Sequence, residues 1–373
     1  MKIILAVNSM QSGGAERVAS TLVNAWAARG DSVTLVATFS GRGECFFPLA
    51  ENVKLVYLAD RVSGAKKGIA SYIARFKAFR ALVRETKPDV IVSFLTSVNI
   101  STIVASRGLG VPHVASEHSN PLADGRSAFW RLLCRLVYPK ANAVTLLTQD
   151  VTAAFSKRVP GIKNLVVLPN PVPDELLLMK RQPLESGSRK RIIALGRLHE
   201  LKQFDVLINA FSMLAARFPD WDLWIWGEGA ERASLEALIA SRSLAGRVFL
   251  PGRTSTPWDE MARSQAFVLS SRYEGLPMAL MEGMALGLPC VSFDCPSGPK
   301  ELTRDGRDGV LLPPGDAQSL SRALSDLLAD EHESEAYGRR AAQSIRERYS
   351  LQRVLHQWDE LFARLGVKRA MSR

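Results

Sequence analysis

The chain begins Met1-Lys-Ile-Ile-Leu-Ala-Val-Asn8-Ser-Met-Gln-Ser-Gly13-Gly14-Ala-Glu-Arg17, a short apolar run followed by a pair of glycines. The run has no small-residue cleavage site, so it predicts a first β-strand rather than a signal peptide. Two adjacent glycines at the start of a helix let a ligand approach the backbone, and the free amides there favour an anion. A tight strand-to-helix turn without a ligand is the alternative interpretation.

The same alternation of strand and helix continues along all 373 residues. Several of the apolar runs are continuous, as expected of parallel strands that are buried on both faces. The predicted strands are 2–7, 32–38, 53–58, 89–94, 112–116, 143–148, 164–168, 191–196, 222–226, 247–250, 265–270, 289–293 and 309–312. The pattern predicts an α/β fold of two doubly wound, Rossmann-like domains that face a cleft, with ligands at the carboxyl ends of the strands.

A change in composition marks the boundary between the two domains. The segment from Pro169 to Lys190 is rich in proline and then polar, which is typical of an exposed linker. We therefore predict an N-terminal domain over 1–170, a linker over 171–190 and a C-terminal domain over 191–350. The remaining helix, 351–373, could pack back toward the N-terminal domain.

The positive charge of the chain is concentrated in its first half. The net charge is +11, and residues 1–180 hold 22 Lys/Arg against 12 Asp/Glu. Such an asymmetry indicates an anionic partner, which could be a membrane surface, a nucleic acid or a phosphorylated substrate. Four cysteines without a C-x2-C pair indicate reduced thiols in the cytosol, and no apolar stretch is long enough to span a membrane.

A basic segment over 66–87 carries much of this charge. It contains seven Lys/Arg and a single acidic residue, Glu85, and its apolar residues recur at roughly helical spacing. The segment could lie on anionic lipid or hold the phosphates of a lipid-linked acceptor; a packed helix with a solvated basic face is the alternative. The cations that we expect to contact acceptor or membrane are Lys66, Lys67, Arg75, Lys77, Arg80 and Arg84.

Two motifs in the second half could bind a nucleoside diphosphate. Arg197 and Lys202 follow a predicted strand, and together they provide a planar fork and a point charge for a diphosphate. The segment Glu274-Gly-Leu-Pro-Met-Ala-Leu-Met-Glu282 follows another strand, and the amides of Gly275, Leu276 and Met278 would lie at a helix start that Pro277 enters. Solvated surface cations and a simple helix-dipole carboxylate are the alternative interpretations.

These motifs, together with Gly227-Glu228-Gly229, Ser116-Glu117-His118 and Cys295-Pro-Ser-Gly-Pro-Lys-Glu301, resemble glycosyltransferase family 4 over most of the chain. The resemblance is strongest to the bacterial branch that builds surface and lipid-linked glycans. It implies a retaining enzyme of the GT-B fold that takes a sugar from a nucleotide-sugar, which we expect to be UDP-linked. The domain over 1–170 would be the acceptor-binding domain, and the domain over 191–350 would bind the nucleotide-sugar. The acceptor would be a polyprenyl-diphosphate-linked saccharide, and the enzyme would be cytoplasmic and peripherally bound to the inner face of the membrane.

The resemblance also implies roles for single residues. Arg197 and Lys202 would hold the donor diphosphate, Glu282 the ribose and Glu274 the donor sugar. Gly14 would lie against the phosphates, and His118 would sit by the sugar. Gln203 departs from the glycine that usually follows the lysine, which affects the expected loop geometry and leaves the diphosphate role unchanged.

No metal or other cofactor is expected. The literal D-x-D sequence Asp220-Trp221-Asp222 precedes a strand, at the end opposite the expected ligand edge, so we interpret it as a solvated turn. A sugar-nucleotide epimerase of the same architecture is an alternative enzyme. A basic protein that binds nucleic acid or membrane is a second alternative, but no nucleic-acid recognition motif is recognisable and no nucleic-acid partner is expected.

Overall fold

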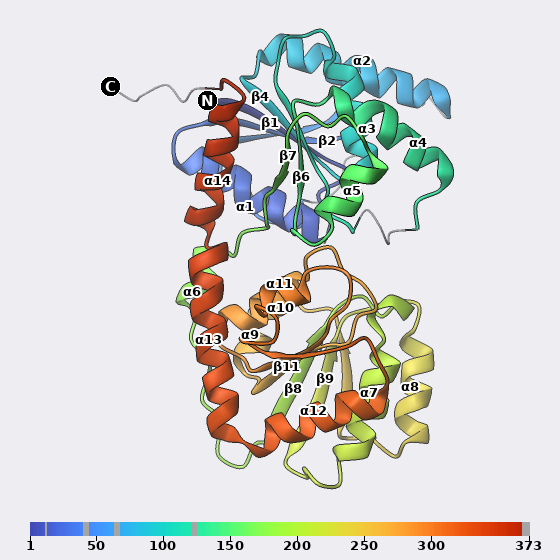
Figure 1. Ribbon diagram of the computed structural model, residues 1–373, viewed down its shortest axis with the longest axis vertical. Helices are drawn as coiled ribbons and strands as arrows, with labels where there is room; N and C mark the ends of the chain where they lie inside the picture. Colours follow the sequence, from blue (N-terminus) through green and yellow to red (C-terminus); the bar gives the residue numbers. More distant parts are fainter. Residues whose placement is uncertain (12, 40–44, 63–67, 121–124, 368–373) are drawn as a thin grey trace. The chain divides into compact units, whose positions relative to one another are not determined.

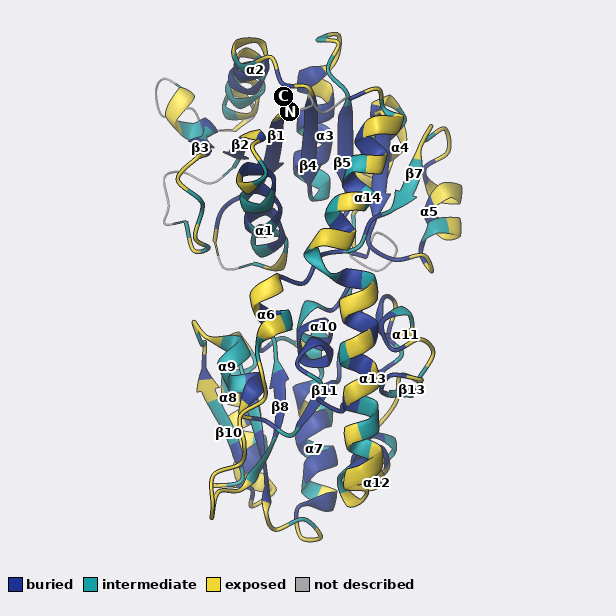
Figure 2. Cartoon of the chain, turned by 90° about the vertical axis from the view of Figure 1, so that its left-hand side faces the viewer, coloured by how far each residue is buried: buried dark blue, intermediate teal, exposed yellow. Residues whose placement is uncertain are grey.

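The computed structural model describes residues 1–11, 13–39, 45–62, 68–120 and 125–367 (Figure 1). The chain forms two compact units. Unit 1 comprises Met1–Pro171 together with the segment from Val354 onward, and unit 2 comprises Val172–Arg353. Within each unit the central strands are buried and the edge strands are only partly so, and most exposed residues lie on helices and loops (Figure 2).

Unit 1 is built on a parallel sheet of seven strands in the order β3-β2-β1-β4-β5-β6-β7. Its elements are β1 (Lys2–Val7), α1 (Gly14–Ala28), β2 (Ser32–Ala37), β3 (Val53–Tyr57), the 3-10 turn η1 (Leu58–Arg61), α2 (Ile69–Thr86), β4 (Val90–Phe94), α3 (Thr96–Ser106), β5 (His113–Ser116), α4 (Ala128–Val137), the 3-10 turn η2 (Tyr138–Lys140), β6 (Ala143–Leu146), α5 (Thr152–Arg158) and β7 (Leu165–Val167). Residues 3–7 of β1 are buried because helices cover both faces of the sheet.

The last helix, α14 (Leu351–Arg364), packs on α1. Trp358 meets Trp26 edge-on, with ring centroids 5.9 Å apart. Arg29 donates through both terminal nitrogens to the carboxylate of Asp359, at 2.7 and 2.6 Å. The final helix therefore belongs to unit 1 from Val354 onward, although the chain reaches it only after completing unit 2.

Unit 2 holds a parallel sheet of six strands in the order β10-β9-β8-β11-β12-β13. Its elements are α6 (Asp174–Leu178), β8 (Lys190–Leu195), the 3-10 turn η3 (Glu200–Lys202), α7 (Phe204–Leu214), β9 (Trp221–Trp226), α8 (Arg232–Ser241), β10 (Val248–Gly252), α9 (Pro257–Ala262), β11 (Ala266–Leu269), α10 (Met278–Ala285), β12 (Cys290–Phe293), α11 (Pro299–Leu302), β13 (Val310–Leu312), α12 (Ala317–Ala329) and α13 (Glu331–Tyr349). A core of α7 and α12 residues packs against β8, β9, β11 and β12.

The α/β fold class is confirmed, and the thirteen predicted strands all form, with ends within two residues of the prediction. The expected exposed linker differs over its first part. Val172 is buried and its N–H donates to the Tyr349 carbonyl at 2.8 Å, and Leu176 of α6 is also buried. Only residues 180–189 are exposed throughout. Pro171 and Pro173 are therefore buried in a packed part of the segment, and Pro183 lies in its exposed part.

Candidate active site

The order of the strands brings the predicted donor residues of unit 2 to one place. The order reverses between β8 and β11, because the chain builds β9 and β10 outward from β8 and then returns to its other side. The loops after β8 and β11 therefore leave the sheet side by side at its carboxyl edge, where doubly wound sheets bind ligands. Arg197 and Lys202 follow β8, and Glu274 follows β11.

The loop that carries Arg197 is fixed by close backbone packing. A β-carbon at Gly229 would lie 2.1 Å from the carbonyl oxygen of Leu198, and one at Gly227 would lie 1.8 Å from that of Gly196. Only glycine therefore allows the loop after β9 to rest on the loop after β8. Arg197 stands between the two contacts and its side chain is exposed, so its guanidinium can reach an anion at this edge.

Lys202 and Glu274 form an ion pair. The Nζ atom of Lys202 lies 2.5 Å from Oε1 of Glu274, and the Ser271 hydroxyl donates to the same oxygen at 2.6 Å. The Ser270 hydroxyl donates to the Lys202 carbonyl at 2.7 Å, which fastens the two loops together. Both charged side chains are partly buried, with exposed fractions of 25% and 14%. The pair presents a cation for a phosphate next to a carboxylate that can accept bonds from sugar hydroxyls.

Gln203 takes the backbone conformation that glycine favours. Its φ of 48° and ψ of 42° are left-handed, and it ends η3 and begins α7. A side chain in this conformation costs about 1–2 kcal/mol. The departure from the family pattern is therefore accommodated by strain, and the turn that presents Lys202 forms.

The segment after Glu274 leads into α10. The Ser297 hydroxyl donates to the carbonyl of Gly275 at 2.7 Å, which holds the turn 275–277. Pro277 stands immediately before the helix, so the first helical residue is Met278, one position later than the pattern predicts. Glu282 lies in the second turn and is only 3% exposed. The start of α10 thus faces the same carboxyl edge as Lys202 and Glu274.

In unit 1, Gly14 stands at the corresponding reversal, after β1 and beside β4. Gly13 precedes α1, and a β-carbon there would lie 2.1 Å from Oε2 of Glu16, which is the far end of a side chain that can turn away. The same construction at Gly14 meets nothing within 4 Å. The open space at Gly14 leaves room for an approaching ligand.

His118 follows β5 and packs against Phe94 at the end of β4, with ring centroids 3.9 Å apart and ring planes tilted by 36°. Its Nε2 lies 3.2 Å from the Ser116 hydroxyl. Its Nδ1 is buried, and no group among the described residues bonds to it. Burial lowers the pKa of His118 to about 3, so the ring is neutral at physiological pH. A neutral imidazole with an unpartnered nitrogen can bind a hydroxyl group but brings no charge.

The sequence analysis assigned no role to Glu117, although this residue belongs to the Ser116-Glu117-His118 motif. This carboxylate is 1% exposed. It accepts hydrogen bonds from Arg126 at 2.5 Å, from Thr96 at 3.1 and 3.2 Å, and from the hydroxyl of Tyr138. Its position directly after the buried strand 113–116 was the feature of the sequence that could have indicated a buried carboxylate. A buried carboxylate with this many donors holds together the elements around His118.

The basic segment over α2 contributes fewer free cations than expected. Arg75 donates to the carbonyls of Thr38 and Phe39, at 3.0 and 2.6 Å. Arg80 donates to the carbonyls of Ala105 and Arg107, both at 2.8 Å. These two arginines hold α2 against the sheet and α3. Of the other expected docking cations, Lys77 and Arg84 are exposed, and Lys66 and Lys67 lie outside the described residues.

The Asp220-Trp221-Asp222 sequence is not a solvated turn over its whole length. Asp222 lies at the start of β9, is buried, and pairs with Arg247 and Arg189, each at 3.1 Å. Its position at the amino end of the strand agrees with the prediction, but its surroundings do not. Among the described residues no group of acidic, histidine or cysteine side chains could hold a metal ion.

Comparisons with known proteins agree with this architecture. The family described as "Glycosyltransferase Family 4" matches residues 12–176, and "Glycosyl transferases group 1" matches residues 178–344. An uncharacterised glycosyltransferase of Haemophilus influenzae is 26% identical over 94% of this chain and 97% of its own length. A Campylobacter jejuni enzyme, named as an α-1,4-N-acetyl-D-galactosaminyltransferase that acts on a diNAcBac-PP-undecaprenol-linked saccharide, is 29% identical over 97% and 98%.

Solved structures show the same fold. The Anabaena protein HepE in complex with UDP has a TM-score of 0.79 at 19% identity and covers 98% of this chain and 100% of its own. Sucrose-phosphate synthase from Thermosynechococcus elongatus has a TM-score of 0.83 at 18% identity, over 98% and 99%. Fold and sequence together define a glycosyltransferase of the GT-B class. The chain belongs to glycosyltransferase family 4, and its activity is that of a transferase.

Proposed function

We propose that this enzyme transfers a sugar from a UDP-linked donor, with retention of configuration, to a polyprenyl-diphosphate-linked saccharide. The donor sugar would be a hexose or an N-acetylhexosamine. The observation that carries the proposal is the pairing of Lys202 with Glu274 beside the exposed Arg197, at the edge of the unit 2 sheet where the strand order reverses. The HepE complex with UDP supports the choice of nucleotide.

Each donor group has a matching residue in unit 2. Arg197 and Lys202 would bind the diphosphate as a fork and a point charge. Lys202 and Ser271 both bond to Oε1 of Glu274 and hold the carboxylate in place. The carboxylate would accept further hydrogen bonds from hydroxyl groups of the donor sugar. Glu282 would bind the ribose, and the backbone of Gly275–Met278 would lie against the phosphates at the start of α10.

The chemistry requires stabilisation of the leaving group rather than a protein nucleophile. The bond between the anomeric carbon and the phosphate oxygen breaks as the acceptor oxygen bonds to the same face of that carbon. The acceptor proton passes to the leaving phosphate. Fixed cations stabilise the negative charge that develops on the diphosphate, and no metal ion is needed for this role. From unit 1, Gly14 would lie against the phosphates, and the neutral His118 would bond to a sugar hydroxyl.

The acceptor is proposed from charge and from the named activity of one relative. Unit 1 carries the positive excess of the chain, which suits the diphosphate of a lipid-linked acceptor and an anionic membrane surface. The Campylobacter jejuni relative is named for an undecaprenyl-diphosphate-linked acceptor. Among the described residues no helix is long and apolar enough to cross a membrane. We therefore propose peripheral attachment to the cytoplasmic face of the membrane, in the synthesis of a surface polysaccharide or lipopolysaccharide.

The test measures UDP binding and sugar transfer in Arg197→Ala and Glu274→Gln. Removal of the Arg197 fork should weaken UDP binding and transfer by at least tenfold, as expected for a charge-assisted contact worth more than about 1.4 kcal/mol. Glu274→Gln should retain UDP binding and lose transfer, because its contact is with the sugar. Arg339→Ala is the matched control, because Arg339 of α13 is 64% exposed and pairs with Glu335 of the same helix. Normal transfer by both site variants would overturn the assignment of the site.

Two further measurements separate the alternatives. Transfer that persists in EDTA supports the cation-based mechanism, and complete loss that added Mg²⁺ restores would refute it. Isomerisation of the donor sugar without an acceptor would instead indicate a sugar-nucleotide epimerase on this architecture.

A further inference from the structure

Helix α4 exposes an apolar face that the fold does not cover. Phe129, Leu132 and Leu136 have exposed fractions of 63%, 55% and 54%. Their spacing of three and four residues places them on one side of the helix. The opposite side packs into unit 1 through Cys134 and Val137. Three large apolar side chains on one exposed helix face indicate an interaction site rather than scattered surface residues.

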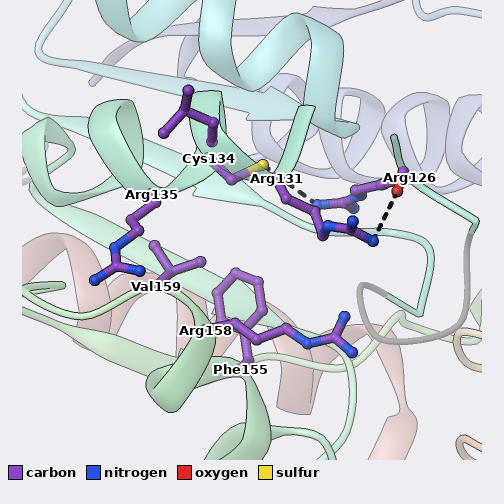
Figure 3. A pocket seen from close by; sticks show the side chains of 8 residues that line it. Arg126, Arg131, Cys134, Arg135, Phe155, Arg158 and Val159 are labelled. Carbon is purple, nitrogen blue, oxygen red and sulfur yellow. Dashed lines mark hydrogen bonds between the residues drawn. The ribbon is translucent and has the colours of Figure 1, made fainter. Parts of the chain in front are cut away.

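Arginines border this face and line a cavity between α4 and α5. Arg131 and Arg135 come from α4, one turn apart, and Arg158 ends α5. They surround a cavity of about 370 Å³ that Phe155 and Val159 also line. Figure 3 shows Arg131 and Arg158 on one side of the Phe155 ring and Arg135 on the other. Among the described residues no carboxylate pairs with Arg131 or Arg135, so the cavity suits an anion.

Both ends of α4 are tied to the same buried carboxylate. Arg126, two residues before the helix, donates to Glu117 at 2.5 Å. Tyr138, directly after the helix, also donates its hydroxyl to Glu117. Rolling α4 so that its apolar face turned inward would break these bonds and leave a charge buried without a partner. The apolar face of α4 is therefore held outward. The bonds that hold it there lead to Glu117, the residue that precedes His118.

We propose that α4 docks this enzyme on a bilayer that contains anionic phospholipid. Phe129, Leu132 and Leu136 enter the boundary of the acyl chains, and a lipid phosphate occupies the arginine cavity. Charge favours a membrane over a second copy of this chain, since residues 125–163 contain seven Lys/Arg and a single Asp, and two copies of such a surface repel. The inference deepens the proposed function, because it names the surface that reaches the lipid-linked acceptor.

The proposal also moves the predicted membrane contact from α2 to α4. In α2, Arg75 and Arg80 each donate through one terminal nitrogen to backbone carbonyls of unit 1, which ties these side chains to the fold. The exposed cations Lys77 and Arg84 remain as the competing surface. The two helices can therefore be tested against each other in one experiment.

The test is co-flotation of the full chain with vesicles of phosphatidylcholine alone or mixed with phosphatidylglycerol. We expect the wild type to bind only the mixed vesicles. Arg131→Gln with Arg135→Gln should weaken binding by about thirtyfold, at the usual contribution of surface-bound cations. Phe129→Ser with Leu132→Ser and Leu136→Ser should abolish it. These side chains are exposed, and near-ultraviolet circular dichroism checks that the fold is retained.

The controls decide between the possible occupants. Met213→Ser removes a large side chain that is 59% exposed on α7 and should bind vesicles as the wild type does. Loss of binding in Lys77→Gln with Arg84→Gln, but not in the α4 variants, would overturn the proposal in favour of α2. A concentration-dependent dimer that the triple serine variant dissolves would overturn it in favour of a second copy.

Sugar transfer to a water-soluble acceptor analogue is read in parallel. Retained transfer with no vesicle binding by the wild type refutes the docking inference and leaves the proposed function intact. Vesicle binding without any transfer would count against the proposed function alone.

Discussion

Replacement of Gly229 by alanine should displace the carboxyl edge of the unit 2 sheet, where the candidate donor residues lie, without changing any of their side chains. The new β-carbon would lie 2.1 Å from the Leu198 carbonyl oxygen, and also within 3.0 Å of the carbonyl carbon and the nitrogen of that residue. These are backbone atoms, so no side chain can rotate away. Since β-carbons in proteins do not approach other atoms closer than 3.0 Å, the two loops must separate by about 0.9 Å.

That separation moves the backbone next to Arg197. A misplacement of about 1 Å in a positioned group can cost about 100-fold in rate. We therefore expect kcat/KM for sugar transfer to fall by about two orders of magnitude, and UDP binding to weaken with it. Forcing an extra methyl group into a packed contact should also lower the free energy of unfolding by about 1–3 kcal/mol.

The assay compares kcat/KM, UDP binding by calorimetry and urea unfolding for the wild type, Gly229→Ala and Ala230→Ser. Ala230 lies in the same loop and is exposed, so its variant should behave as the wild type. Wild-type kcat/KM in a Gly229→Ala protein that is measurably destabilised would show that this contact does not position Arg197. Wild-type stability would show that the two loops do not rest on each other.

Two other predictions concern single residues. Gln203→Gly should raise the free energy of unfolding by about 1 kcal/mol in urea, because glycine adopts the left-handed conformation at Gln203 without strain; a destabilised variant would contradict this. Burial lowers the pKa of His113 to about 3 from its ordinary value of 6.5. The unfolded chain therefore binds more protons in this range, and lowering the pH from 7.0 to 5.5 should reduce the free energy of unfolding by about 1 kcal/mol through this residue. Urea unfolding of His113→Asn should show a weaker pH dependence, and an equal dependence would refute the assignment.

The neutral state of His118 is consistent with a contact role rather than an acid or base role. Because burial holds its pKa near 3, this side chain contributes no inflection to a pH–rate profile between pH 5 and pH 9. His113 forms a second buried imidazole, bonded to the hydroxyls of Ser93 and Ser106 at 2.9 and 3.0 Å. Both ring nitrogens of His113 are thus hydrogen-bonded inside unit 1, whereas Nδ1 of His118 has no hydrogen-bond partner among the described residues.

The positions of the strands could be predicted from the sequence because burial on both faces produces continuous apolar runs. Gly14, Arg197 and Glu274 could be assigned to strand ends for the same reason, since each follows such a run. The apolar pattern of α4 was also present in the sequence. Its significance was not, because an apolar helix face is normally buried, and only the fold shows that Phe129 and Leu136 stay outside.

The sequence alone determined that this protein is an α/β glycosyltransferase and which strand ends carry its polar residues, because hydrophobic periodicity and short motifs are local properties. The tertiary structure decided which of those residues meet. Lys202 bonds to Glu274 only because β8 and β11 are neighbours, and a burial pattern does not encode the order of strands in a sheet. The tertiary structure also decided which basic residues of unit 1 have partners. Arg75 donates to backbone carbonyls, whereas Arg135 forms no ion pair among the described residues.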